Sequence, residues 1–283
     1  MRNQENEDLK YLTRTTGAKF VRIASIAGLA LAAFVSAGPV HATQYNEGEY
    51  TVWDNSKYYI DDQSGGYPTY LQTVSNMSST NSRMIWNVDW NFSNSGVNYG
   101  LKYPAVHMGW HWGYPAHYPS TTTGLPTQLA AGKTVSSVWN FAFANTPDNN
   151  WSGYDVAWDC WFHWNGAPTW QNQPNYELMI WPYSNSQPVG SKLENVTIGG
   201  QAYELWGGPV NSWYTFSFRK VNQTQSISLK ISDFTNYLIN DNNTAVKNTG
   251  FNKWVYLTGV EAGVENYNGT GHLYNWWYQS DVY

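Results

Sequence analysis

The chain of 283 residues is poor in cysteine and in charge. A single cysteine, Cys160, excludes an internal disulfide framework. It stands between Asp159 and Trp161 in an apolar stretch, so we expect a buried and inert thiol. Charged residues make up 12% of the chain, the net charge is −5 and no basic run occurs, which argues against nucleic acid and anionic membranes as partners.

Motifs for several kinds of chemistry are also missing. His107, His111 and His117 raise the question of a metal, but no acid lies between the first two. Pro104 and Gly109 also argue against the helix that a metalloprotease motif requires. We therefore expect surface histidines, no metal site and no cofactor. The sequence contains no Gly-x-Ser-x-Gly elbow and no phosphate-binding glycine loop, so serine and P-loop chemistry lack support.

No apolar run reaches the length of about 18 residues that favours a membrane-spanning helix. The run from Ile23 to Val35 follows basic residues and precedes the small-residue pattern Val40-His41-Ala42, which is typical of a secretory signal. We predict that residues 1–42 are a signal peptide and that residues 43–283 form one domain. The mature protein is then expected to be an extracellular monomer without a membrane partner.

Aromatic residues are abundant, with 17 Trp and 22 Tyr among many Asn, Ser, Thr and Gly. Most should fill the core of a β-sandwich. Many lie close to Gly, Pro and Asn, however, and planar rings on a weakly charged surface suit neutral, hydroxyl-rich ligands. The composition favours a sugar as the ligand.

Short apolar alternations separated by turn residues predict many antiparallel strands. In 84–92, Trp86 and Trp90 fall on one face with Val88. The segment 99–111 contains Pro104 and Gly109, so it is either an edge strand or a strand broken by a bulge. One helix is predicted over 233–239, with Ser232 as its N-cap. This pattern indicates an all-β sandwich or jelly roll.

One strand carries an acid among apolar residues. In Asn175–Trp181, alternation places Glu177, Met179 and Trp181 on the same face. A glutamate in such surroundings must be paired or functional. Asp159 lies on the preceding strand, and a hairpin can place it beside Glu177, which would raise the pKa of one carboxyl.

A second acidic cluster follows in 259–269, where Glu261 and Glu265 share a face. Two carboxyl groups from distant strands are what glycosidic cleavage requires, one to attack or activate water and one to protonate the leaving oxygen. The proton donor needs a raised pKa. The strand pattern alone allows either Glu261 or Glu265 to be the proton donor.

At these residues the chain resembles glycoside hydrolase family 12. The segment 176–181 resembles the nucleophile strand of the family, 158–162 the strand before it and 260–273 the acid/base strand. Shorter matches at 188–190, 199–201 and 236–238 follow in family order. The resemblance implies an all-β jelly-roll sandwich of two antiparallel sheets, with one short helix and a concave substrate cleft.

The resemblance implies that Glu177 is the nucleophile, Glu265 the general acid/base and Asp159 a hydrogen-bonding partner that tunes Glu177. The family retains anomeric configuration, so the two catalytic carboxyl groups should lie about 5 to 5.5 Å apart. Glu261 remains the rival for the acid role. Around the acid the family has Gly-Thr-Glu-Pro-Phe, where this chain has Gly-Val-Glu-Asn-Tyr at 263–267.

The family motif Asn-Asn-x-Trp-Gly is missing, and Tyr58 or Tyr59 should supply its stacking. The expected sugar-binding residues are Trp181, Met179, Trp86, Tyr58, Tyr59 and Trp110. The implied function is a secreted, retaining endo-β-1,4-glucanase acting on cellulose, xyloglucan or mixed-linkage glucan. The alternatives are a xyloglucan-specific hydrolase or transglycosylase on the same fold, and a non-catalytic carbohydrate-binding jelly roll.

Overall fold

A computed structural model describes residues 50–53, 57–61, 72–80, 83–92, 102–111, 123–144, 153–169, 171–267 and 269–283. The predicted signal peptide and His117 lie outside these ranges, so the structure does not test those predictions. Among the described residues, no helix combines the length and the apolar character needed to cross a membrane.

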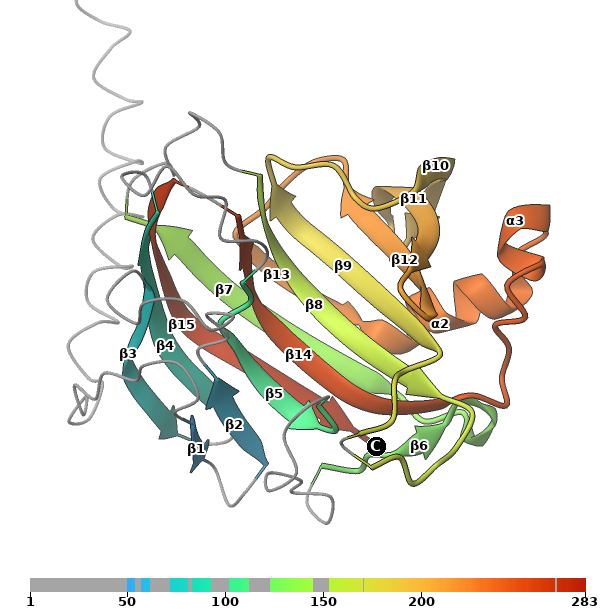
Figure 1. Cartoon of the computed structure of the whole chain (residues 1–283), viewed down its shortest axis with the longest axis horizontal. Coiled ribbons are helices and arrows are strands. Elements are labelled where there is room, and N and C mark those ends of the chain that lie inside the picture. Colours follow the sequence, from blue (N-terminus) through green and yellow to red (C-terminus); the bar gives the residue numbers. More distant parts are fainter. Residues whose placement is uncertain are drawn as a thin grey trace, which may run out of the picture. The chain divides into compact units, whose positions relative to one another are not determined.

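The described strands form two sheets, which Figure 1 shows one behind the other. The larger sheet has the order β1 (Tyr50–Trp53), β2 (Tyr58–Asp61), β5 (Ala105–Gly109), β14 (Tyr256–Asn266), β8 (Tyr154–His163), β9 (Tyr176–Ser184), β12 (Trp213–Lys220), β11 (Gln201–Val210) and β10 (Ser191–Ile198), and the short β6 (Thr127–Gln128) pairs with β14. The smaller sheet has the order β13 (Ser226–Lys230), β7 (Val135–Phe143), β15 (Thr270–Val282), β4 (Arg83–Asn91) and β3 (Gln72–Thr80). The predicted two-sheet, all-β fold is confirmed.

One pair of strands differs from the predicted antiparallel arrangement. β12 lies parallel to β9, with Thr215 opposite Glu177, whereas the other paired strands described are antiparallel. The chain leaves β9, forms the β10–β11 hairpin and returns along β12, so β12 enters the sheet in the same direction as β9. This arrangement places β12 side chains directly beside Glu177.

The helical prediction is partly wrong. α2 spans Ile231–Asn240, and its N-cap is Lys230 in an extended conformation rather than Ser232. The Ser232 hydroxyl instead accepts a hydrogen bond from the backbone of Val135. The described residues contain two further short helical segments, the 3₁₀ helix η2 (Leu129–Ala131) and α3 (Thr244–Lys247). α2 buries Phe234 and Leu238 in the core, as its helical spacing of apolar residues requires.

The core fills the space between the two sheets. In β4, Trp86, Val88 and Trp90 are buried on one face, which confirms the predicted alternation. In β8, Trp158 and Cys160 point into the same core. The Cys160 thiol is buried, as predicted, and burial raises its pKa, which disfavours the reactive thiolate.

The predicted segment 99–111 is described from residue 102 onward, and its strand is more central in the sheet than predicted. β5 begins after Pro104 and lies between β2 and β14, so it is not an edge strand. It ends at Gly109, which has a φ of +89°. A Cβ atom there would come within 2.4 Å of the carbonyl oxygen of Thr258, so a side chain at this position would clash with the neighbouring strand. Glycine therefore permits the sharp turn that follows β5.

Candidate active site

Five buried carboxyl groups gather on three neighbouring strands, on the face of the larger sheet that points away from the core. They are Asp155 and Asp159 of β8, Glu177 of β9, and Glu261 and Glu265 of β14. Residues between them, such as Val156, Leu178 and Val264, belong to the core, so alternation turns the acids the other way. Glu177 and Glu265 are the most exposed of the five, each at 7%.

Glu177 is held by two donors from β12. The Thr215 hydroxyl donates to Glu177 Oε2 at 2.6 Å, and Trp213 Nε1 donates to the same oxygen at 3.0 Å. Burial raises the pKa of Glu177 to about 7; the two hydrogen bonds oppose this shift, while the nearby charges of Glu265 and Glu261 add to it. Both protonation states of Glu177 are therefore accessible near neutral pH.

Asp159 interacts with Glu177 differently from the prediction. Across the β8–β9 pair, Trp161 lies opposite Glu177 and Asp159 lies opposite Met179, so the two acids are diagonal neighbours on one face. The described residues show no hydrogen bond between Asp159 and Glu177. Burial raises the pKa of Asp159 well above its usual value, and the charge of Glu177 is the largest contribution from a neighbouring acid. Their coupling is electrostatic.

Asp155 is a site residue that the sequence reasoning missed. It lies directly opposite Glu265 across the β8–β14 pair, and the charge of Glu265 adds to the burial that raises the pKa of Asp155. Burial raises the pKa of both groups, and the Tyr267 hydroxyl lies 3.5 Å from Glu265 Oε2. Two close carboxyls cannot both ionise readily, and their interaction raises the pKa of Asp155 while it lowers that of Glu265. Asp155 has the same parity as Asp159 in its strand. Alternation along the sequence could therefore have placed both side chains on the same face.

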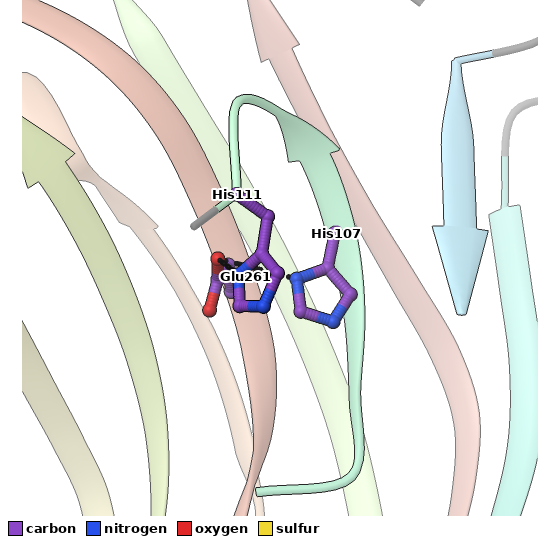
Figure 2. A group of neighbouring side chains, drawn as sticks. All are labelled: His107, His111 and Glu261. Atoms are coloured by element: carbon purple, nitrogen blue, oxygen red, sulfur yellow. Dashed lines mark hydrogen bonds and ion pairs between the residues drawn. The ribbon is translucent and has the colours of Figure 1, made fainter. Parts of the chain in front are cut away.

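Glu261 has a different environment, formed by two histidines (Figure 2). Its Oε1 lies 2.6 Å from His111 Nδ1 and 3.2 Å from His107 Nδ1. Burial alone would raise the pKa of Glu261, but the two histidines outweigh it and lower the pKa to about 2. His107 is fully buried and His111 is 7% exposed. The prediction of surface histidines is therefore wrong for these two residues, because alternation along β5 turns His107 toward Glu261.

Four of the predicted sugar-binding residues lie on or beside the acid-bearing face. Met179 and Trp181 pack with Ala157 in a small cluster separate from the main core. The Tyr59 ring stacks on His107 with ring centroids 4.7 Å apart. Trp110 donates from Nε1 to the carbonyl oxygen of Thr169.

Two predicted sugar-binding residues lie in the core instead. Trp86 and Tyr58 have no exposed surface. Trp86 stacks on Trp139, and the Tyr58 hydroxyl donates to the carbonyl oxygen of Ser280. The prediction that they bind sugar is wrong, since the alternation of their strands turns both side chains toward the opposite sheet.

A row of tryptophans beside Glu177 was also missed. Trp161 makes edge contacts with Trp213 at 5.8 Å and with Trp110 at 6.3 Å between ring centroids. Trp161 lies directly across from Glu177 and shares the parity of Asp159, so its face could be read from the strand pattern. Trp213 could not be assigned in this way, because its position depends on the parallel return of β12.

The chain resembles known proteins over about half of its length. It is 31% identical over 161 residues to endoglucanase S of Pectobacterium parmentieri and 30% identical over 149 residues to xyloglucan-specific endo-beta-1,4-glucanase A of Emericella nidulans. These alignments cover 53% and 51% of this chain, and 55% and 56% of the two relatives. The chain thus spans little more than half the length of these curated relatives.

One solved structure covers a larger share of the chain than these relatives do. The native family 12 xyloglucanase from Bacillus licheniformis aligns with a TM-score of 0.71 and 28% identity, over 85% of this chain and 100% of that one. The family model described as glycosyl hydrolase family 12 matches residues 48–281, a range that contains both sheets and all five acids. The chain belongs to glycosyl hydrolase family 12.

Proposed function

We propose that the protein is a secreted endo-β-1,4-glucanase that cleaves internal glucosidic bonds with retention of anomeric configuration. Family membership and the activities named for its relatives support hydrolysis of a β-1,4-glucan. The observation that carries the proposal is the pair Glu177 and Glu265. These are the two most exposed acids of the cluster. The raised pKa of Glu265 suits a proton donor, and the hydrogen bonds from Thr215 and Trp213 favour the carboxylate form of Glu177 that a nucleophile needs.

Glu177 is the proposed nucleophile. Thr215 and Trp213 both donate to its Oε2, and among the described residues no hydrogen bond reaches Oε1. Oε1 can therefore attack the anomeric carbon while Oε2 stays fixed. The C–O bond to the leaving sugar breaks as the glycosyl–enzyme bond forms, and water later cleaves that ester to regenerate the carboxylate.

Glu265 is the proposed general acid/base. It gives a proton to the leaving oxygen in the first step and takes one from the attacking water in the second. Burial raises the pKa of Glu265 and favours its protonated form before reaction, while the neighbouring Asp155 opposes part of this shift. Glu261 is a poor candidate for this role, because a carboxyl with a pKa of about 2 holds no proton at ordinary pH.

The substrate should lie along the acid-bearing face, against Met179 and Trp181, with Tyr59 and Trp110 at its side. Xyloglucan is a second candidate substrate because relatives with that specificity match the chain. Transglycosylation would use the same intermediate with a sugar as acceptor. We further propose that residues 1–42 direct export and that the mature enzyme is a monomer.

The test is hydrolysis of carboxymethyl cellulose, xyloglucan and mixed-linkage β-glucan, with NMR of the first product formed. We expect new reducing ends whose anomeric carbon is initially β. Initial release of the α-anomer would contradict the retaining mechanism. Binding of all three glucans without new reducing ends would instead support the non-catalytic alternative.

The Thr215→Val variant should shift the acid limb of the pH–rate profile to higher pH. The lost hydrogen bond stabilises the carboxylate form, so its removal raises the pKa of Glu177. A hydrogen bond to a charged group contributes about 1.5 to 3 kcal/mol, which corresponds to a shift of about 1 to 2 pH units. Ser217→Ala, two residues along β12, provides the control. An unchanged acid limb in Thr215→Val would rule out this role for the hydroxyl.

A further inference from the structure

His107, His111 and Glu261, the last of which is one of the five clustered acids, form a compact group of metal-type donors. One donor atom from each residue lies within 4.8 Å of the other two. Figure 2 shows both imidazole rings facing the Glu261 carboxylate. All three side chains are buried.

Backbone geometry holds the three residues in place. His107 of β5 lies directly opposite Glu261 of β14 in the sheet. After Gly109 the chain turns sharply, and the backbone of Trp110 donates to the carbonyl oxygen of Thr258 on β14. This turn returns His111 to the same carboxylate, as Figure 2 shows.

Hydrogen bonding alone leaves the group incompletely satisfied. Neither ring nitrogen of His107 has a hydrogen-bond partner among the described residues, and neither has Glu261 Oε2. The contact of His107 Nδ1 with Glu261 Oε1 has ion-pair distance but lacks the geometry of a hydrogen bond. Buried polar atoms without partners are costly, whereas a cation bound between the three side chains would engage His107 Nδ1 directly.

The spacing suits a transition metal. Bonds of about 2.1 Å to nitrogen and oxygen place two ligand atoms of one ion about 3.0 to 3.4 Å apart. His107 Nδ1 already lies 3.2 Å from Glu261 Oε1. The 2.6 Å contact of His111 Nδ1 with Glu261 Oε1 would have to widen by several tenths of an ångström, which a small side-chain rotation allows, as the ion replaces the proton between them.

From these contacts we infer that His107, His111 and Glu261 bind one divalent transition-metal ion, with Zn²⁺ as the best-suited ion. Two imidazoles and one carboxylate form a donor set that Zn²⁺ uses in proteins, with a further position open to water. Mg²⁺ and Ca²⁺ prefer oxygen ligands and should not bind here. Glu261 itself belongs to the acid cluster and lies opposite Asp159, so the ion would sit at the β5 side of that cluster, one strand away from β8.

The experiment measures Zn²⁺ binding to the full chain, prepared without a polyhistidine tag, by calorimetry and by metal analysis after gel filtration. We expect about one Zn²⁺ per chain and no comparable binding of Ca²⁺. Removing a residue that only hydrogen-bonds to a metal ligand commonly weakens metal binding about 10- to 100-fold. Loss of a ligand itself in His107→Phe or His111→Phe should therefore weaken binding by at least about 100-fold. His272→Phe is the matched control, since His272 pairs with Asp89 alone in the other sheet.

Binding that is absent, or that is equally tight in wild type and His107→Phe, would overturn the assignment. Anomalous diffraction at the zinc edge from wild-type crystals keeps the test decisive if a variant fails to fold. It should show one peak between the three side chains, and a peak only elsewhere would overturn the proposal. The Glu177→Gln variant should bind Zn²⁺ normally, so the result is independent of the proposed hydrolysis.

Discussion

Glu177→Gln should reduce hydrolysis of carboxymethyl cellulose on the order of 10⁴-fold or more, with little change in glucan binding. The amide cannot form the glycosyl–enzyme ester efficiently. It does keep the size of the side chain and an oxygen that accepts from Thr215 and Trp213. The loss should therefore appear in kcat, measured by release of reducing ends, while affinity measured by retardation in glucan-containing gels stays close to that of the wild type.

Stability provides an independent readout for the same variant. The folded-state pKa of Glu177 is about 7, above the value of about 4.5 for an unperturbed glutamate, so its protonated form is favoured in the native state. This contribution to stability is fully present below pH 4.5 and is lost as the pH rises toward 7. Removing the charge should make Glu177→Gln more resistant to urea than the wild type at pH 8, with a smaller difference at pH 4.

Glu194→Gln is the matched control for Glu177→Gln. Glu194 lies on β10 of the same sheet, with the parity of the core residues Val196 and Ile198, and therefore on the opposite face from the acid cluster. Its substitution should leave kcat within a few-fold of the wild type. If Glu177→Gln also retained near-normal kcat, Glu177 could not be the nucleophile.

Glu265→Gln should reduce hydrolysis of unactivated glucans by about 10²- to 10⁴-fold, the range typical of general acid–base catalysis. A good leaving group such as dinitrophenolate departs without a proton. Glu265→Gln should therefore slow the first step far less with an aryl cellobioside that carries this leaving group than with a glucan. The measurement is the ratio of wild-type to variant kcat/KM for the two substrates, together with the disappearance of the basic limb of the pH–rate profile.

Glu261→Gln distinguishes the two candidates for the acid. Glu261 is ionised and paired with His111 and His107, so its replacement should disturb that group without producing a dependence on the leaving group. If the leaving-group dependence appeared in Glu261→Gln and was missing in Glu265→Gln, the acid role would pass to Glu261.

Much of the architecture follows from local patterning. Alternation in 84–92 predicted which side chains of β4 enter the core, and alternation in 175–181 placed Glu177, Met179 and Trp181 on one face. The same rule assigns Cys160 to the core and Asp159 to the opposite face. A period of two residues is a property of each strand, so it can be read without knowledge of the strand's neighbours.

Mistaken assignments arose where composition was used in place of strand pairing. Tyr58 was expected to bind sugar in place of the missing family motif and Trp86 was also expected in the sugar site, although both side chains pack against the opposite sheet. His107 and His111 were expected at the surface because no acid lies near them in sequence. Their partner, Glu261, comes from β14, which the fold brings beside β5.

The amino-acid sequence was therefore sufficient for the two-sheet fold, the family resemblance and the choice of Glu177 and Glu265 as candidate catalytic acids. Only the tertiary structure decided the environment of each acid. Strand order and register set Thr215 beside Glu177, Asp155 beside Glu265 and two histidines beside Glu261. The pKa of a buried carboxyl depends on such contacts over a few ångströms, and residues far apart in the chain supply them.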